Sequence, residues 1–242
     1  MKRKNVDEPY LPETVSRRFP PTRIEYKDAS HHFFIRPFEP SEASALNEVI
    51  KESANELYHF LFLPYFPSEM SDRVDRLLKA KANYFMGLRY EMGVFEASTG
   101  EILMGCGYFT ENGRNPAAME IGFWTATKYA RQGWATLVTQ VLIAVGFEAF
   151  FSDRLEVVVN PENAASLRVI HKCGFKHEGK MRNSLLVPTD EMVKHGFTRE
   201  RTLSLFALIP DDISELDWYP YICSNTTLTT LAGVEKKLKN TT

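Results

Sequence analysis

Residues 120–136 of the chain read Glu120-Ile-Gly-Phe-Trp-Thr-Ala-Thr-Lys-Tyr-Ala-Arg-Gln-Gly-Trp-Ala-Thr136, an apolar strand that leads through a short turn into a helix. Gly133 stands where the helix opens, and apolar residues recur at helical spacing from Trp134 to Val145. The first N–H groups of a helix have no partner within it, and the helix dipole puts partial positive charge at the same end. We therefore predict that this turn binds an anion such as a pyrophosphate.

The composition is that of a globular protein. Of the 242 residues, 44% are hydrophobic and 25% are charged, which is too apolar for a wholly disordered chain. The length permits one domain or two. The 29 Lys and Arg residues nearly balance the 31 Asp and Glu residues, giving a net charge of -2. The overall charge therefore gives no sign of a nucleic acid or an anionic membrane as a partner.

The cysteines indicate a reducing environment. Cys106, Cys173 and Cys223 are widely spaced and fit neither a disulfide framework nor a paired metal motif. We expect a cytoplasmic protein without a bound metal. The longest apolar run, residues 141–151, is interrupted by Glu148 and is too short to cross a bilayer, and the first thirty residues lack the pattern of a signal peptide.

The order of predicted elements describes one α/β domain over residues 31–210. An N-terminal extension, residues 1–30, is rich in proline and charge, and residues 211–242 are expected to form a C-terminal tail. Order is expected to begin at the strand of residues 32–37. Further strands are predicted at residues 88–96, 101–109, 119–125, 155–159, 175–182 and 202–208, and helices at residues 40–50, 68–84, from 133 and from 160.

Two of these helices carry detailed expectations. In the helix at residues 68–84, Val74, Leu77 and Leu78 share one face, so charged residues such as Arg73 and Arg76 can face water. The later helix is expected to begin at residues 160–161, Asn-Pro, because asparagine is a preferred cap and proline suits the first helical position. A glycine at position 174 is placed to end that helix in a left-handed conformation.

Two motifs, in this order, resemble those of the GCN5-related N-acetyltransferase (GNAT) superfamily. The first is a strand followed by Arg131-Gln-Gly-Trp-Ala-Thr136 and a helix. The second is a strand followed by Asn160-Pro-Glu-Asn-Ala-Ala-Ser166 and a helix that ends at Cys173-Gly-Phe175. The chain is most similar to ribosomal-protein alanine acetyltransferases of the RimJ/RimL type, over residues 32–208. The resemblance implies a single GNAT (acyl-CoA N-acyltransferase) domain with a mixed, mostly antiparallel sheet, splayed at its centre, and helices on both faces.

The resemblance also implies acetyl-CoA as co-substrate, with its pyrophosphate on the first motif and its pantetheine arm beside the splayed edges of the two central strands, residues 120–125 and 155–159. Where the family's turn usually begins with Gln or Arg, this chain has Ala130. Because backbone N–H groups make most of the pyrophosphate contact, we expect this departure to weaken binding without abolishing it, and Arg131 can compensate. The cofactor-binding residues expected on this basis are Phe123, Trp124, Thr125, Arg131, Gln132, Gly133, Trp134, Ala135, Thr136, Asn160 and Asn163.

The family's reaction is the direct attack of an amine on the thioester carbonyl, and two residues are candidates for its chemistry. Glu120 starts the strand beside the thioester and is the candidate base; the alternative is a surface carboxylate paired with a lysine or arginine. Ser166 matches a serine that donates a hydrogen bond to the leaving sulfur; the alternative is a bond from its hydroxyl back to the preceding helical turn.

Several acceptors remain open. A free α-amine has a pKa of ~7.7–8.0 and a lysine ~10.4, so an N-terminal amine of a protein demands less of its base. A small-molecule amine such as a polyamine or antibiotic is the alternative, and Ala130 with the terminal extensions leaves room for a catalytically silent acyl-CoA-binding module. Residues 56–66, rich in Tyr, His and Phe, form either core or one side of the acceptor groove. We expect a monomer or homodimer that binds neither nucleic acid nor membrane.

Overall fold

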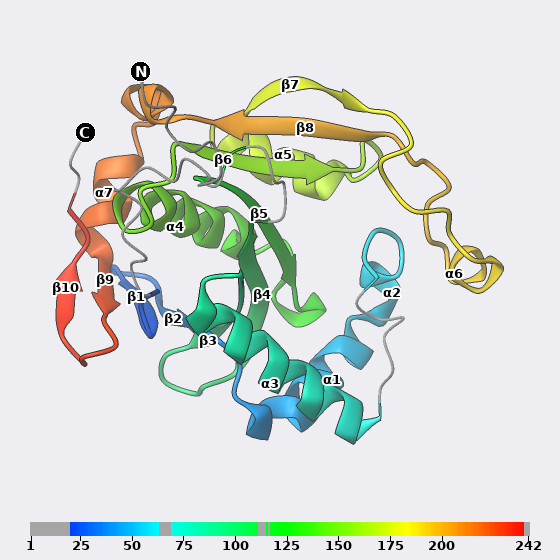
Figure 1. Cartoon of the computed structure of the whole chain (residues 1–242), viewed down its shortest axis with the longest axis horizontal. Coiled ribbons are helices and arrows are strands. Elements are labelled where there is room, and N and C mark those ends of the chain that lie inside the picture. The colour runs from blue at the N-terminus through cyan, green and yellow to red at the C-terminus, as the bar shows by residue number, and fades with distance from the viewer. Residues whose placement is uncertain (1–19, 63–68, 111–114, 116, 240–242) are drawn as a thin grey trace, which may run out of the picture.

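The computed structural model describes residues 20–62, 69–110, 115 and 117–239. They form one ten-stranded sheet with helices on both faces (Figure 1). The strand order is β10-β9-β1-β2-β3-β4-β5-β6-β8-β7. The pairing of β5 with β6 is parallel and every other pairing of neighbours is antiparallel. The predicted fold class is confirmed.

The strands are β1 (Arg23–Lys27), β2 (His32–Arg36), β3 (Arg89–Glu96), β4 (Ile102–Phe109), β5 (Ala118–Thr125), β6 (Arg154–Val159), β7 (Lys176–Met181), β8 (Leu203–Leu208), β9 (Thr226–Thr229) and β10 (Glu235–Lys237). The helices are α1 (Ala43–Glu52), α2 (Ala54–Leu57), α3 (Met70–Met86), α4 (Trp134–Glu148), α5 (Ala164–Lys172), α6 (Asp190–Lys194) and α7 (Tyr219–Asn225). Short 3-10 segments lie at η1 (Pro40–Glu42), η3 (Thr127–Tyr129) and η4 (Pro210–Glu215).

The sheet separates two apolar layers, because alternate side chains of a strand point to opposite faces. In β2, Phe33 and Ile35 join the larger layer, which is covered by α4, α5 and α7, while Phe34 joins the smaller layer beneath α1 and α3. Helix α4 is buried at residues 138, 139 and 141–147, and most of these join the larger layer. The larger layer thus supports α4 and the turn that precedes it.

The two central strands, β5 and β6, separate soon after they begin. The last of their three register pairs joins Glu120 to Glu156, although β5 continues to Thr125 and β6 to Val159. Beyond that pair the facing backbone edges of the two strands diverge. This is the splay at the centre of the sheet that the sequence predicts.

Segments on both sides of the predicted domain limits belong to this sheet. Strand β1 pairs with β2 and β9, and its Ile24 and Tyr26 are fully buried, so the expectation that order begins at residue 32 is wrong. In the expected C-terminal tail, Ile222 and Cys223 of α7 join the larger core. Strand β1 is short and its partner β9 lies about 200 residues away, so no local pattern reveals the pairing. Residues 1–19 of the predicted extension lie outside the described residues.

Helix α3 presents a different face to the core from the one predicted. Arg73, expected to face water, is 3% exposed, while Leu78, expected to be inside, is 51% exposed. Leu77 is buried as predicted. The helix is therefore rotated so that Arg73, Arg76 and Leu77 face the sheet. This orientation depends on the surfaces of α1 and the sheet against which α3 packs, and not on the sequence of the helix alone. Ser68, where this helix is predicted to begin, lies outside the described residues.

Helix α5 begins three residues later than predicted. Its N-cap is Asn163, whose Oδ1 accepts the N–H of Ser166 at 3.0 Å. Asn160 instead forms a turn, with its Oδ1 accepting the N–H of Glu162 at 2.8 Å. The expectation of a cap at residues 160–161 is wrong because two asparagines compete for the role and the later one meets the first free N–H of the helix. The predicted left-handed ending at Gly174, with φ of 88°, is confirmed.

Candidate active site

The turn before α4 presents a row of backbone N–H groups without partners. Arg131 and Gly133 both have left-handed backbones, with φ of 62° and 90°. Within the described parts of the chain, the N–H groups of residues 131–136 donate no hydrogen bond, whereas the N–H of Leu137 already bonds to the C=O of Gly133 at 3.1 Å. Such a row at the positive end of a fifteen-residue helix is a site for an anion.

The side chains of this turn keep clear of the N–H row or support it. Arg131 is exposed, and the Nε2 of Gln132 donates to the C=O of Lys128 at 2.9 Å. The Trp134 ring packs edge-on against His31 and Phe33, with ring centroids 5.2 and 5.8 Å away. The tryptophan therefore anchors the start of α4 to β2, and its backbone N–H is the group left for a ligand.

Beside this turn, the open edge of β5 offers further backbone groups. The N–H of Ala126 donates to the C=O of Leu103 at 3.0 Å, at the β4 side of the strand. Because backbone N–H groups alternate between the two edges of a strand, those of Phe123 and Thr125 point to the opposite edge, where β6 has separated. The backbone of Trp124 faces β4 instead, so of the three predicted contacts on β5, Trp124 is the one whose backbone is turned away from the opening.

The second motif lies across the opening, at the end of β6 and the start of α5. Asn163 uses its Oδ1 for the helix cap, and the structure records no bond of the Ser166 hydroxyl with the described residues. The bond from that hydroxyl to the preceding turn, the alternative raised above, is thus not made. Asn160 is buried and donates its Nδ2 to the C=O of Glu200 at 3.1 Å, which ties the end of β6 to the segment before β8.

Glu120 lies at the point where the central strands separate. Glu120 lies opposite Glu156 in the last register pair of β5 with β6. On the other side of β5 it lies opposite Phe109 of β4. Its side chain shares a face of β5 with Gly122 and Trp124, since residues two apart in a strand point the same way. A carboxylate is therefore placed between the open edge of β5 and the α1/α3 side of the sheet.

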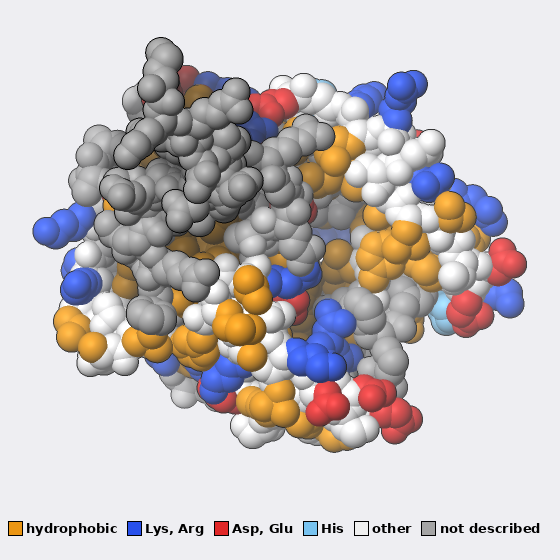
Figure 2. Space-filling model, viewed as in Figure 1, with side chains coloured by type: hydrophobic (Ala, Val, Ile, Leu, Met, Phe, Trp, Pro, Cys, Tyr) orange, Lys and Arg blue, Asp and Glu red, His pale blue; other side chains and the backbone are white. Residues whose placement is uncertain are grey.

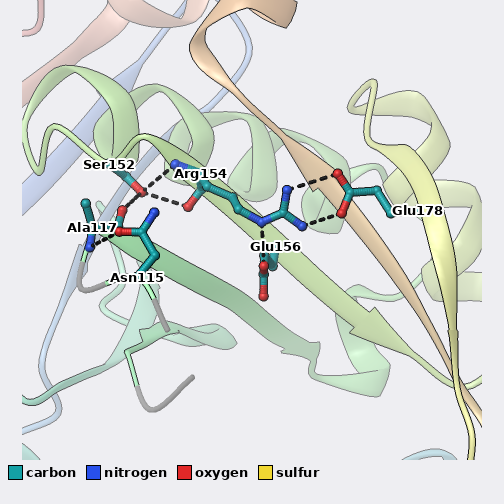
Figure 3. Close-up of polar contacts among 6 residues, drawn as sticks. All are labelled: Asn115, Ala117, Ser152, Arg154, Glu156 and Glu178. Carbon is teal, nitrogen blue, oxygen red and sulfur yellow. Dashed lines mark hydrogen bonds and ion pairs between the residues drawn. The ribbon is translucent and has the colours of Figure 1, made fainter. Parts of the chain in front are cut away.

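The neighbouring carboxylate, Glu156, is held by an ion-pair network (Figure 3). Arg154 donates its Nε to Glu156 at 2.5 Å and its two Nη groups to Glu178 on β7. These hydrogen bonds lower the pKa of Glu178. The hydroxyl of Ser152 bonds to the C=O of Ala117 at 2.6 Å, fastening the start of β6 to that of β5. Glu156 is thus bonded to Arg154, and Glu120 stays the candidate base that the sequence indicates.

A cavity of about 240 Å³ lies on the α1/α3 side of β3, β4 and β5. The indole of Trp124 lies over Gly105, where a Cβ would overlap it. Gly122 and Phe123 of β5 line the cavity. The cavity therefore adjoins the same strand whose edge toward β6 is open. The lining from α3 is basic and includes Arg73 and Arg76.

The aromatic segment after α2 borders this cavity. Leu61 and Phe62 line it, and the Phe62 ring lies 5.0 Å from that of Phe197. The His59 ring bonds to the C=O of Gly196 at 2.9 Å. The segment around α6, which sequence patterns did not single out, therefore joins residues 58–62 at the edge of the site. Tyr65 and Phe66 lie outside the described residues.

Among the described residues, no three His, Cys, Asp or Glu side chains gather in a way that could hold a metal ion. No described helix combines the length and the hydropathy needed to cross a membrane.

Comparison with known proteins gives consistent results. The sequence matches the family described as "Acetyltransferase (GNAT) domain" over residues 32–176. It is 26% identical over 162 residues to YdaF of Bacillus subtilis (strain 168), named "Putative ribosomal N-acetyltransferase", covering 65% of this chain and 85% of YdaF. Among solved structures it resembles Mycobacterium smegmatis RimJ in complex with CoA-disulfide, with a TM-score of 0.67 and 18% identity over 80% of this chain and 90% of that one.

A second solved structure is RimL, described as a ribosomal L7/L12 alpha-N-protein acetyltransferase in complex with coenzyme A. Its TM-score is 0.64 and its identity 17%, over 77% of this chain and 98% of RimL. At identities of 18% and 17%, the similarity to these two structures is evidence for the fold alone.

Proposed function

The chain belongs to the GNAT family of acetyltransferases, and we propose that it transfers the acetyl group of acetyl-CoA to the α-amine at a protein N-terminus. The observation that supports this most is the row of N–H groups at residues 131–136, which have no partners among the described residues and follow β5, whose edge is open, in the chain. The names of the relatives point to ribosomal proteins as acceptors of those enzymes, RimL among them.

The residues present fit acetyl-CoA. The N–H row suits its pyrophosphate, and the outward backbone groups of Phe123 and Thr125 suit the amides of its pantetheine arm. The hydroxyl of Ser166, at the start of α5, makes no hydrogen bond with the described residues. It can therefore donate to a sulfur atom without giving up such a bond. Bound there, acetyl-CoA would supply an acyl group already activated as a thioester.

Glu120 would accept a proton from the acceptor's ammonium, directly or through a water molecule, so that the neutral amine can attack the thioester, and Ser166 would donate a hydrogen bond to the leaving sulfur. About a tenth of an α-amine is unprotonated at pH 7, against well under a thousandth of a lysine. A site with a single candidate base therefore suits an N-terminal amine better than a lysine side chain.

The experiment is a thermal-shift titration with acetyl-CoA followed by an assay of thiol release. Binding at a hundred times the dissociation constant should add ~2.7 kcal/mol to the free energy of unfolding. Thiol release is then measured with peptides that carry a free or a blocked N-terminus, with a lysine peptide, and with polyamines. Release with free N-termini alone supports the proposal. Release with polyamines alone indicates a small-molecule enzyme, and binding without release from any amine indicates a silent module.

A further inference from the structure

Arg73 is a buried cation with no carboxylate partner among the described residues. It is 3% exposed, and its hydrogen bond among the described residues runs from its Nε to the neutral Oδ1 of Asn47 at 2.5 Å. None of the ion pairs between described residues includes it. Burial and the nearby charge of Arg76 lower the pKa of its guanidinium. A charge taken out of water is costly unless it is paired, so an unpaired one lining a cavity indicates that something else supplies the opposite charge.

The described lining of the cavity is rich in arginine. Arg73, Arg76 and Arg89 line it with a single carboxylate, Glu91, among its described residues. Glu91 already accepts the Nε of Arg89 at 2.6 Å. The remaining lining is largely apolar and aromatic and includes Trp124. Figure 2 shows Lys and Arg side chains beside a hollow over the α3 part of this face.

One cavity thus connects the arginines of α3 with the residues of β5 at the splay. We propose that it binds the acceptor, and that this acceptor carries a carboxylate held by Arg73 and Arg76 while its amine lies toward Phe123. The position of the amine rests on the function proposed above. A guanidinium pairs with a carboxylate through parallel N–H donors, and the aromatic walls suit an apolar segment between the two ends of the acceptor. The carboxylate comes either from an acidic side chain near a peptide N-terminus or from a free amino acid.

Matched acceptors separate these sources. One pair is the tripeptide amide Ala-Glu-Phe against Ala-Gln-Phe, and the other is phenylalanine against phenylalaninamide. We expect the wild type to favour the carboxylate member of one pair by at least about tenfold in kcat/KM, mainly through KM, as for a charge-assisted contact. The pair that shows the preference identifies the source.

Variants attribute the preference to the cavity. Arg76→Gln should remove most of it, because it should lower kcat/KM far more for the carboxylate member than for the neutral member. Arg73→Met, which keeps the volume of the side chain, should do the same. Lys79→Gln removes one charge from the exposed side of the same helix, outside the cavity lining, and should keep the preference. The intrinsic reactivity of each amine cancels when the preference within one acceptor pair is compared between the wild type and a variant.

If Arg73 has a purely structural role, Arg73→Met should lower the melting temperature and change kcat/KM alike for both members of a pair. Equal use of both members by the wild type, or a preference that survives Arg76→Gln and Arg73→Met, overturns the inference while acetyl transfer stands. Binding of the two tripeptides to the CoA-loaded protein, measured by calorimetry, covers the case of slow turnover. Equal affinities there overturn the inference as well, whereas a failure of the proposed function would appear as no thiol release with any amine and no stabilisation by acetyl-CoA.

Discussion

Arg73 of α3 and Asn47 of α1 are joined by a 2.5 Å hydrogen bond in which both partners are 3% exposed. The bond connects the two helices that cover the smaller apolar layer, and its donor is charged while its acceptor is neutral. The pair therefore holds a cation at the wall of the cavity without neutralising it.

The two residues should respond unequally to substitution. Asn47→Leu leaves the buried guanidinium without its acceptor and should lower the free energy of unfolding by about 2–3 kcal/mol. Arg73→Met removes the charge itself and should cost less than about 1 kcal/mol. In the double variant, Arg73→Met should recover part of the loss caused by Asn47→Leu. Urea unfolding of the four proteins measures this, and additive effects would contradict it.

Glu120→Gln should lower kcat by about 10²–10⁴, the range of general base catalysis, with the affinity for acetyl-CoA nearly unchanged. The control is Glu156→Gln, because Glu156 is already bonded to Arg154. It should change kcat much less. The measurement is single-turnover acetyl transfer with a calorimetric Kd for acetyl-CoA. An unaltered kcat of Glu120→Gln at pH 7 would show that another group takes the proton.

Gly133→Ala should weaken acetyl-CoA binding through backbone strain. A Cβ at Gly133 would meet nothing within 4 Å, so its φ of 90°, rather than crowding, sets the cost. We expect a loss of about 1–2 kcal/mol of stability and a redirection of the N–H row. Gly233→Ala is the matched control, because Gly233 also has positive φ, 72°, and open space. It should lose similar stability and keep its acetyl-CoA affinity; equal affinity of both variants contradicts the assignment of the turn.

Asn163 and Ser166 should separate stability from chemistry. The helix cap joins the side chain of Asn163 to the backbone N–H of Ser166, so Asn163→Ala should lower the free energy of unfolding by about 1 kcal/mol. Ser166→Ala keeps that N–H and should leave stability unchanged while lowering kcat. Thermal unfolding and thiol-release kinetics test the pair. An unchanged kcat of Ser166→Ala would show that Ser166 has no catalytic role.

Stability should fall in acid through Glu42. Burial raises the pKa of Glu42, but bonds from Arg36 at 2.6 and 2.9 Å and from the N–H of Glu39 at 2.7 Å outweigh it, so the pKa lies below its usual value of 4.5. A depressed pKa stabilises the folded state above the unfolded pKa, and this contribution is lost as the pH falls through the folded pKa. The difference in unfolding free energy between wild type and Glu42→Gln should be constant above about pH 5 and shrink below it. A constant difference down to pH 3 would contradict this.

Much of the site was predictable because its signals are local. The left-handed glycine before Trp134 and the apolar spacing after it identify the start of α4, and the N–H row follows from helix geometry alone. The strand of Glu120 and the serine of α5 were likewise placed by short patterns. The exact cap of α5 was not, because Asn160 and Asn163 are equally good caps in isolation, and only the path of the chain selects between them.

The chain by itself determines its four longest helices, most of its strands, the turn before α4 and the order of the two motifs, because periodicity and capping act over a few residues. The tertiary structure alone decides that β1 and β9 extend the sheet, at which residue β5 and β6 separate, and that Arg73 turns inward to Asn47. Each of these depends on surfaces contributed by segments far apart in the chain, whose fit no local pattern records.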